Sequence, residues 1–175
     1  MRVLGIAGWS GSGKTTLLTA LLAALIARGH RVSTIKHAHH AFDIDQPGKD
    51  SHRHRAAGAH EVLVASANRW ALMHELRGAA EPDLDDLLTH LAPVDLVLVE
   101  GFKSHAHDKI EVHRPALAQR LLAETDPHIV AIACDVASPA VTARGLPLLP
   151  LADTAAIVAF VERHCGLVPQ RRRSA

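Results

Sequence analysis

The chain has 175 residues, of which 48% are hydrophobic and 21% charged, and its formal net charge is +1 at pH 7. This length and composition suit one α/β domain with a sizeable core. The balanced charge and the aromatic content of 3% argue against a nucleic-acid surface, which needs a basic stripe or stacking aromatic rings.

The strand and helix patterns alternate, and the predicted strands are short, apolar runs. In the first third of the chain we expect a strand at 3–7, a helix at 16–27, a strand at 31–36, and a polar loop at 37–50 with a short hairpin around Phe42 and Ile44. A helix at 50–58, adjacent strands at 61–65 and 70–74, and a helix at 82–91 should follow. The rest should form strands at 94–99 and 110–113, a helix around 117–122, a strand at 129–133, an edge strand at 147–151 and a helix at 153–164.

Cysteine usage and the apolar segments indicate in which compartment of the cell we expect the protein. Cys134 and Cys165 lie far apart in the sequence, so neither a zinc ribbon nor a disulfide framework is indicated. The first apolar run leads into a glycine-rich loop rather than a signal-peptide cleavage site, and the helix between Lys14 and Arg28 is too short to cross a bilayer. We therefore expect a cytoplasmic protein that does not enter a membrane.

Residues 8–15 form a complete phosphate-binding motif: a glycine, four further residues, a glycine, a lysine and a threonine. The motif lies between a predicted strand and a predicted helix, which is the context that its chemistry requires. The glycines let backbone N–H groups converge on an anion, and the helix N-terminus adds partial positive charge. The motif predicts a nucleoside triphosphate site formed by Gly8, Ser10, Gly11, Ser12, Gly13, Lys14 and Thr15, with Lys14 on the β- and γ-phosphates and Thr15 on Mg²⁺.

A second acidic group for Mg²⁺ is predicted at the end of an apolar strand. Glu100 ends the strand at 94–99, at the carboxyl end where ligands bind in such folds. Asp95 begins the same strand and should be remote from the site. We predict Thr15 and Glu100 as the metal-binding pair.

The polar segment 35–51 follows the second strand and also emerges at the carboxyl edge. It offers cations for an anionic ligand at Lys36, His37 and Lys49, and carboxylates for the metal or a water at Asp43, Asp45 and Asp50. His37, His39 and His40 could instead bind a transition metal, although 14 histidines spread over the chain make this cluster less telling. The predicted catalytic residues are Lys14, Asp43 and Asp45.

Two further residues are expected at the site. Lys103 follows Glu100 closely, and Asp135 ends the strand at 129–133, where it could accept from N1–H and the exocyclic amine of guanine. A water-orienting Gln and a recognisable arginine finger are missing from the motifs, so fast intrinsic hydrolysis is not expected.

These features predict a three-layer P-loop NTPase fold, because continuously apolar strands imply a mostly parallel sheet with helices on both faces. We expect one NTP-binding domain over 1–166. The basic residues of 167–175 should form a disordered, solvated tail.

Four stretches resemble the MobB family, the molybdopterin-guanine dinucleotide biosynthesis adapter proteins. They are the phosphate loop at 8–15, the segment from Lys36 through Lys49 to 55–59, the pair 64–66 and 69–72, and 98–103 with its Glu-Gly-Phe-Lys. Many NTPases share the phosphate loop, whereas the second and fourth stretches together are far more specific. The Asn-Lys-x-Asp guanine motif of better-known GTPases is absent, and Ala133-Cys134-Asp135 stands instead.

The resemblance implies a homodimeric, cytoplasmic, SIMIBI-type P-loop GTPase of weak activity. Such proteins assist the nucleotidyltransferase that joins GMP to molybdopterin, the molybdenum cofactor guanylyltransferase, as adapters rather than as the enzyme. Carried over by position, the phosphates of GTP would lie on residues 11–16, including Thr16, with Mg²⁺ at Thr15 and Glu100. Contacts with the pterin or the partner are then expected from Lys36, His37, His39, His40, Lys49 and Lys103.

Two alternatives stay open. A small-molecule kinase of the uridine-kinase type also has a Ser-Gly-Ser-Gly-Lys-Thr loop, and Asp43 could serve as its general base. A nickel-insertion GTPase would explain the histidines, but such families add a Cys-bearing metal motif that is missing here.

Overall fold

The computed structural model describes residues 1–38 and 42–168, and its residue contacts divide the chain into two compact units. The main unit comprises Met1–His37 and the chain from Leu91 onward, and the hairpin unit comprises Ala38–His90. Compactness alone does not make two units independent domains, so the single domain over 1–166 stays a prediction. The predicted tail lies largely in 169–175, outside the described residues.

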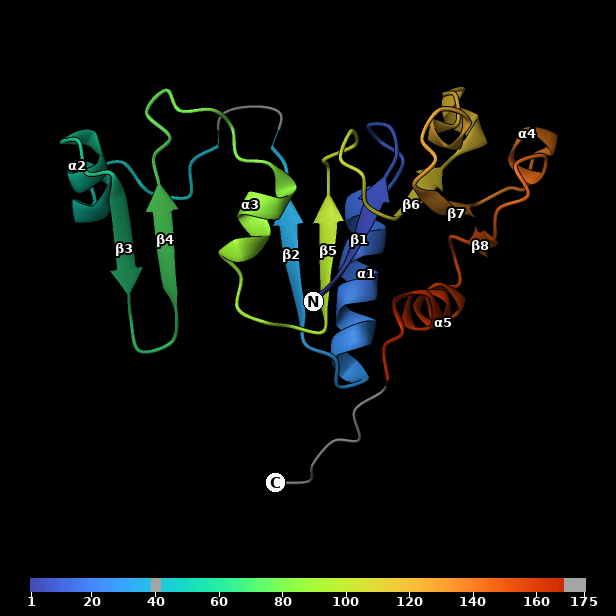
Figure 1. Cartoon of the computed structure of the whole chain (residues 1–175), viewed down its shortest axis with the longest axis horizontal. Coiled ribbons are helices and arrows are strands. Elements are labelled where there is room, and N and C mark those ends of the chain that lie inside the picture. Colours follow the sequence, from blue (N-terminus) through green and yellow to red (C-terminus); the bar gives the residue numbers. More distant parts are fainter. Residues whose placement is uncertain (39–41, 169–175) are drawn as a thin grey trace. The chain divides into compact units, whose positions relative to one another are not determined.

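The main unit is built on a six-stranded sheet in the order β2-β5-β1-β6-β7-β8 (Figure 1). Every pairing in it is parallel, which confirms the predicted α/β class. The strands are β1 (Arg2–Ala7), β2 (Val32–Lys36), β5 (Leu96–Glu100), β6 (Lys109–His113), β7 (Ile129–Cys134) and β8 (Leu148–Pro150).

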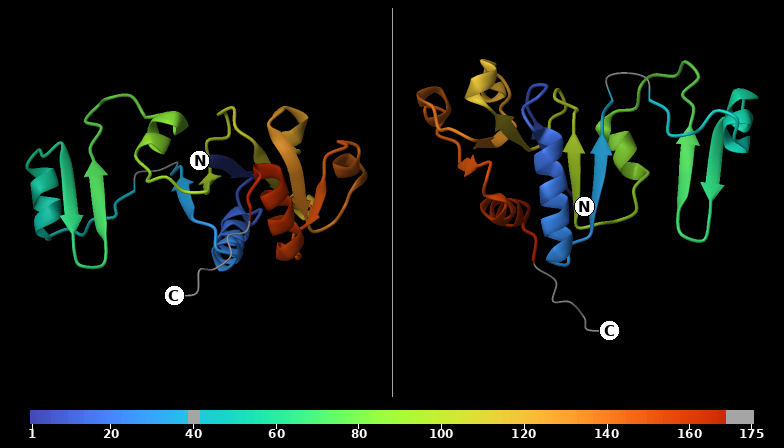
Figure 2. Two further views of the ribbon diagram at one scale, coloured as in Figure 1. Left: turned by 60° about the horizontal axis from the view of Figure 1, so that its bottom comes forward. Right: turned by 180° about the vertical axis from the view of Figure 1, so that it is seen from behind.

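Two helices, α1 (Lys14–Ala27) and α5 (Thr154–Cys165), cover one face of this sheet (Figure 2). Leu21 and Leu25 of α1 and Ile157 of α5 are fully buried in one cluster with alternate residues of the strands. The other face packs against α4 (Pro139–Thr142) and the 3₁₀ turn η2 (Leu122–Glu124), through a second cluster. Burial on both faces explains why the strand sequences are continuously apolar.

Strand β6 is the exception, because it buries charged side chains. Lys109 is 1% exposed and Glu111 is fully buried, on the face opposite Ile110 and Val112. The Lys109 Nζ donates to the backbone C=O of His105 at 2.7 Å and to Asp126 at 3.1 Å. Glu111 accepts from the backbone N–H groups at the start of η2. Both charged groups are therefore satisfied within the core, as burial requires.

The hairpin unit contains α2 (Asp50–Ala56), the antiparallel strands β3 (Glu61–Ala65) and β4 (Trp70–His74), and α3 (Leu84–Thr89). The predicted adjacent strands at 61–65 and 70–74 are confirmed at these bounds. Helix α3 begins with a reciprocal capping box between Asp83 and Asp86, the device expected where an acidic residue precedes a helix.

Two local predictions are wrong. The helix around 117–122 is replaced by the 3₁₀ turns η1 (Pro115–Leu117) and η2. Ala118 adopts a left-handed conformation with φ 50°, and the Glu111 carboxylate accepts from the backbone N–H groups of Leu122 and Ala123. The hairpin around Phe42 and Ile44 is absent from the described residues 42–49. There, side chains rather than a second strand satisfy the backbone: the N–H of Asp45 donates to Asp43.

Across residues 1–38 and 42–168, every helix falls short of the length and apolar character that a bilayer crossing requires.

Candidate nucleotide-binding site

The carboxyl ends of the parallel strands place four segments of the main unit at one edge of the sheet. These are the phosphate loop after β1, residues 100–103 after β5, Arg114 after β6 and Asp135 after β7. The strand neighbours β5-β1-β6-β7 keep these segments adjacent to one another. Most residues predicted from the main unit therefore gather at the edge where ligands bind in open parallel sheets.

The phosphate loop depends on glycine at its first position. Gly8 has φ 144°, and a Cβ there would stand 2.5 Å from the carbonyl oxygen of Val112. A side chain would push the loop away from β6, so only glycine allows this close approach. The loop closes on itself, because Lys14 Nζ donates to the carbonyl of Trp9 at 2.9 Å.

Three lysines gather around this loop. Partial burial lowers the pKa of Lys14, the Glu100 carboxylate opposes the shift, and the ammonium groups of Lys103 and Lys36 lower the pKa further. Lys103 Nζ also lies 5.1 Å from the centroid of the Trp9 ring, within the range of a cation–π contact. Clustered cations repel one another, so the arrangement favours a polyanionic ligand that neutralises them.

Thr15 and Glu100 are in direct contact, so the two side chains lie close enough to bind one metal ion. Thr15 Oγ1 donates to Glu100 Oε1 at 2.8 Å, from the first turn of α1 to the end of β5. A hydroxyl and a carboxylate are hard oxygen donors of the kind that Mg²⁺ prefers. The donor set fits the ion, and the metal role of the pair stays a prediction. Asp95 lies at the other end of β5, as expected, where its side chain accepts from the backbone N–H of Arg31.

The end of β5 packs tightly against the end of β2. Gly101 has φ 107°, and a Cβ on it would stand 2.5 Å from the Cβ of His37. The His37 N–H donates to the Glu100 carbonyl at 2.8 Å, and its ring centroid lies 4.8 Å from that of Phe102. His37 therefore lies beside Glu100, at the rim of the site.

Arg114 is a residue that sequence reasoning missed. Its Nε donates to the carbonyl of Ser12 at 3.0 Å, and its Nη1 donates to Asp135 Oδ2 at 2.7 Å. The signal that could have found it is positional, since Arg114 directly follows β6 just as Asp135 directly follows β7. The Arg114 side chain thus links Asp135 to the phosphate loop.

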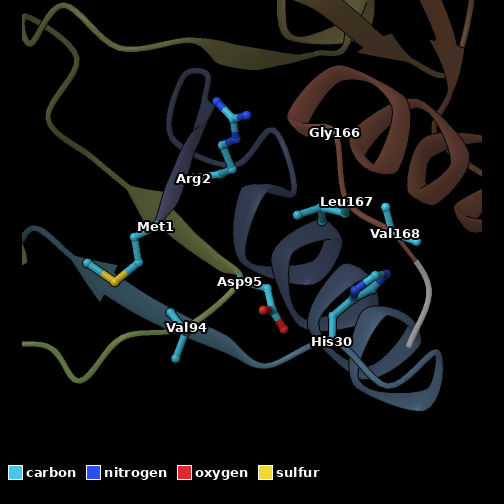
Figure 3. Close-up of a pocket in the computed structure, with 8 residues that line it drawn as sticks. All are labelled: Met1, Arg2, His30, Val94, Asp95, Gly166, Leu167 and Val168. Atoms are coloured by element: carbon cyan, nitrogen blue, oxygen red, sulfur yellow. The ribbon is translucent and has the colours of Figure 1, made fainter. Parts of the chain in front are cut away.

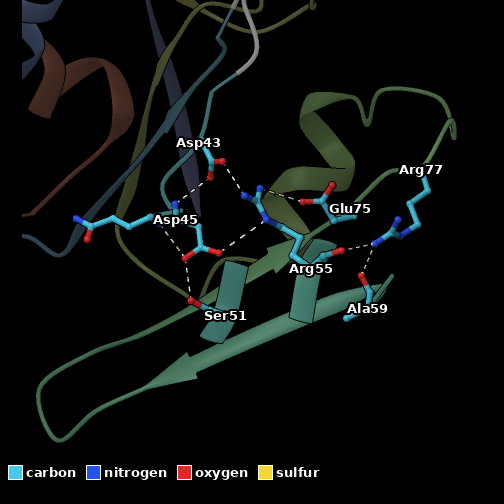
Figure 4. A network of polar contacts seen from close by, with 8 residues as sticks. Asp43, Asp45, Ser51, Arg55, Ala59, Glu75 and Arg77 are labelled. Atoms are coloured by element: carbon cyan, nitrogen blue, oxygen red, sulfur yellow. Dashed lines mark hydrogen bonds and ion pairs between the residues drawn. The ribbon is translucent and has the colours of Figure 1, made fainter. Parts of the chain in front are cut away.

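Asp43 and Asp45 belong to the hairpin unit, where they take part in a network of ion pairs and hydrogen bonds (Figure 4). Arg55 pairs with Asp43 at 2.6 Å, with Asp45 at 3.8 Å and with Glu75 at 3.2 Å. The hydrogen bond from Arg55, followed by that from the Asp45 N–H, holds the pKa of Asp43 below its ordinary value. A carboxylate stabilised in this way is a weaker base, which weakens the kinase alternative. The catalytic role of both residues stays a prediction.

The remaining predicted contacts cannot be joined to this edge. Lys49 lies in the hairpin unit, immediately before α2. His39 and His40 lie outside the described residues. Within the described residues, no group of three or more His, Cys, Asp or Glu side chains could hold a metal ion. The histidine-based alternative therefore gains nothing from the described part of the chain.

A cavity of about 500 Å³ opens at the opposite, amino edge of the main sheet (Figure 3). Two of its polar lining residues are bonded to other side chains or backbone: His30 pairs with Glu162 at 2.9 Å, and Asp95 accepts from the backbone N–H of Arg31. The lining residues are Met1, Arg2, His30, Val94, Asp95, Gly166, Leu167 and Val168. The cavity is thus separated from the phosphate loop by the length of the strands.

Comparison with known proteins shows the family of the chain. The family model described as MobB, molybdopterin guanine dinucleotide synthesis protein B, matches residues 3–135. The chain belongs to the MobB family. The match begins in β1 and ends at Asp135, so it includes the whole phosphate loop, Glu100 and Arg114.

Two curated relatives in the MobB family are named molybdopterin-guanine dinucleotide biosynthesis adapter protein. The chain is 47% identical to the one from Escherichia coli over 137 residues, which cover 77% of this chain and 78% of the relative. It is 46% identical to the one from Haemophilus influenzae over 131 residues, covering 75% and 73%. The similarity therefore extends over most of both proteins.

Solved MobB structures share the fold. The chain resembles the crystal structure of molybdopterin-guanine biosynthesis protein B with a TM-score of 0.71 and 28% identity, over 93% of this chain and 99% of that one. The crystal structure of Bacillus subtilis MobB gives a TM-score of 0.70 and 25% identity, over 93% and 97%. These likenesses confirm the P-loop nucleotide-binding fold that the sequence predicts.

Proposed function

We propose that the chain is a GTP-binding adapter in molybdenum cofactor biosynthesis, acting with the nucleotidyltransferase that attaches GMP to molybdopterin. The observation that carries the proposal is a phosphate loop whose Thr15 contacts Glu100, with Lys36 in register with Glu100 and Lys103 over the Trp9 ring. The names of the relatives support the pathway, and the phosphate loop supports the ligand class.

The loop and its lysines bind the phosphates. Backbone N–H groups at the start of α1, in the stretch that includes Ser10, Gly11, Gly13 and Thr16, meet the phosphate oxygens with the positive end of the helix dipole. Lys14 exchanges its bond to the Trp9 carbonyl for the β- and γ-phosphates. Thr15 and Glu100 would hold Mg²⁺, and the ion would neutralise part of the phosphate charge.

Guanine is recognised by Asp135 in this proposal. The Arg114 bond engages Oδ2 of Asp135, and a carboxylate accepts through both of its oxygens. Asp135 can therefore receive a guanine N–H at Oδ1 while it stays paired with Arg114. Asp135→Asn should relax the preference for GTP, and an unchanged preference would place base recognition elsewhere.

Turnover is slow in this proposal, with Lys14 as the residue that stabilises charge on the transferred phosphate. The main-unit edge presents Lys36, His37 and Lys103, and the hairpin unit presents Lys49, as contacts for molybdopterin or the partner enzyme. His39 and His40 complete the same proposed set. A high turnover number without a partner would contradict the adapter role.

A homodimer completes the proposal, with the β3–β4 hairpin as its interface. Leu63 and Leu72 are paired in register and, with Trp70, share one face of this two-stranded sheet. Their exposed fractions are 60%, 42% and 67%. Two strands alone are marginal in water, and a self-complementary apolar face is suited to a second copy of the chain.

The deciding experiment is a competition titration of GTP against ATP, with Mg²⁺, on the purified protein. A clear preference for GTP is expected, whereas a preference for ATP would favour the small-molecule kinase. Glu100→Gln adds a test of the metal site: affinity should fall about tenfold with Mg²⁺ and much less without it. Equal losses in the two conditions would contradict the metal role of Glu100.

A further inference from the structure

Arg114 stands between the two parts of the site that should meet the triphosphate and the base. Strand β6 lies between β1 and β7, with Ala7 paired to Glu111 and His113 paired to Cys134. Arg114 and Asp135 each follow that last register pair by one residue. The register therefore brings the two side chains together at the carboxyl edge, next to the loop that follows β1.

The Arg114 guanidinium binds the phosphate loop and Asp135 through different nitrogen atoms. Nε donates to the main-chain carbonyl of Ser12, and Nη1 donates to Asp135. Nη2 lies 3.6 Å from the position that a Cβ on Gly13 would occupy, at the cap of α1. The side chains of Arg114 and Asp135 are 41% and 34% exposed, so a ligand can reach the pair.

The rigidity of this bridge depends on arginine. A guanidinium is planar and holds its donors at fixed angles, so moving the Ser12 carbonyl reorients the group that holds Asp135. A lysine has one flexible ammonium and cannot fix both acceptors in one geometry. The arrangement links the conformation of the phosphate loop to the position of the proposed base acceptor.

We infer that Arg114 is a positioning residue that couples base recognition at Asp135 to triphosphate binding on the loop. The inference rests on the proposed function and adds its specificity mechanism. The ligand class is a purine nucleoside triphosphate with an amino group at C2, because Asp135 accepts from that amine only when Arg114 holds it in place. Binding of the triphosphate orders the loop, and the loop then orders Asp135.

Isothermal titration calorimetry with GTP and ITP tests the coupling, since ITP differs only by lacking the C2 amine. The proteins are the full chain, Arg114→Lys, Arg114→Ala, Asp135→Asn and the Arg114→Lys, Asp135→Asn double variant. Arg120→Ala is the matched control, because Arg120 lies 5.9 Å from the Trp9 ring and, within the described residues, forms no bridge to Asp135. Circular dichroism checks that each variant is folded, and Arg114→Lys keeps the charge.

We expect the GTP-to-ITP affinity ratio to fall about three- to tenfold in both Arg114 variants and in Asp135→Asn. The double variant should fall no further than the single ones, and Arg120→Ala should keep the ratio of the unaltered chain. Equal loss of GTP and ITP affinity in the Arg114 variants would overturn the inference. That result is expected if Arg114 only stabilises the phosphate loop and has no effect on base recognition.

Two other outcomes separate the inference from the proposed function. An Asp135→Asn protein that keeps the full ratio would overturn the inference while GTP binding by the chain still stands. An unaltered chain that prefers ATP to GTP would remove the proposed function, and the inference with it.

Discussion

The two units bury their strands in opposite ways. In the main unit, β1, β5 and β7 lie in the interior of a six-stranded sheet, and other elements of the same unit pack on both of its faces. In the hairpin unit, β3 and β4 form a sheet of two strands whose Leu63 and Trp70 are 60% and 67% exposed. The same apolar residue types are core in one unit and surface in the other.

This difference shows that apolar content does not by itself define a core. A strand is buried when neighbouring strands and helices cover it, and the hairpin unit supplies one short helix, α2, against β3. The main unit buries its apolar strands by itself, whereas the hairpin unit leaves the face with Leu63 and Trp70 exposed, the face that we propose as the dimer interface. Changes in the main unit should therefore alter ligand binding and stability, and changes in the hairpin unit should alter association.

The largest expected effect is on nucleotide binding by the main unit. Lys14→Ala removes the ammonium that meets the β- and γ-phosphates, so affinity for GTP should fall by about a hundredfold or more. Calorimetry measures the loss, and circular dichroism should show an intact fold because the loop is at the surface. Arg163→Ala, an exposed cation of α5, is the control. Retained affinity for GTP would refute the assigned role of Lys14.

Acid should destabilise the main unit through His107. Burial, followed by the charges of Lys109 and His105, lowers the pKa of His107 to about 4. The unfolded chain takes up the proton near pH 6.5 and the folded chain does not, so stability present at pH 7 is lost as pH falls toward 4. The loss should reach about 3 kcal/mol.

Urea unfolding between pH 7.5 and 4.5 measures this loss. Trp9 fluorescence in a Trp70→Phe background follows the main unit alone. His107→Gln should flatten the pH dependence, whereas His54→Gln, an exposed histidine of α2, should leave it unchanged. Burial raises the pKa of Glu111, but that group is the same in every variant compared. A His107→Gln protein with the original slope would contradict this assignment.

Association should depend on the hairpin face. Trp70→Glu places a charge in the proposed dimer interface and should weaken the dimer. The variant should dissociate at a protein concentration about tenfold higher, or more, than the unaltered chain. Light scattering during size-exclusion chromatography measures the mass across a dilution series. Asn68→Glu, in the turn between β3 and β4, makes the same kind of change away from the face. Equal masses for Trp70→Glu and the unaltered chain would place any interface elsewhere.

The smallest expected effect is local to the hairpin unit. Arg55→Ala removes the pairs with Asp43, Asp45 and Glu75, so amide exchange in 43–56 should accelerate several-fold. Hydrogen-exchange mass spectrometry measures it, with Arg53→Ala as the control because Arg53 is 76% exposed and pairs with Asp50 at 3.8 Å. Nucleotide affinity should be unchanged. Unaltered exchange would mean that the network does not hold this loop.

The phosphate loop and Glu100 were predictable because both are local signals: a complete motif, and an acidic residue ending an apolar strand. The helix around 117–122 was not, because its fate depends on Ala118 and on a carboxylate from another strand, Glu111. The alternation in β6 also concealed its burial. Burying Lys109 and Glu111 requires the bonds that they make to Asp126 and to the backbone N–H groups of η2, which no local pattern shows.

By itself, the sequence determined the strand–loop–helix at the phosphate site, the α/β class and the family, because these depend on residues close together along the chain. Only the tertiary structure decided that Arg114 joins Ser12, 102 residues away, to Asp135, 21 residues away. Such contacts follow from strand order and register. Those are set by how the whole sheet packs, and no local pattern encodes them.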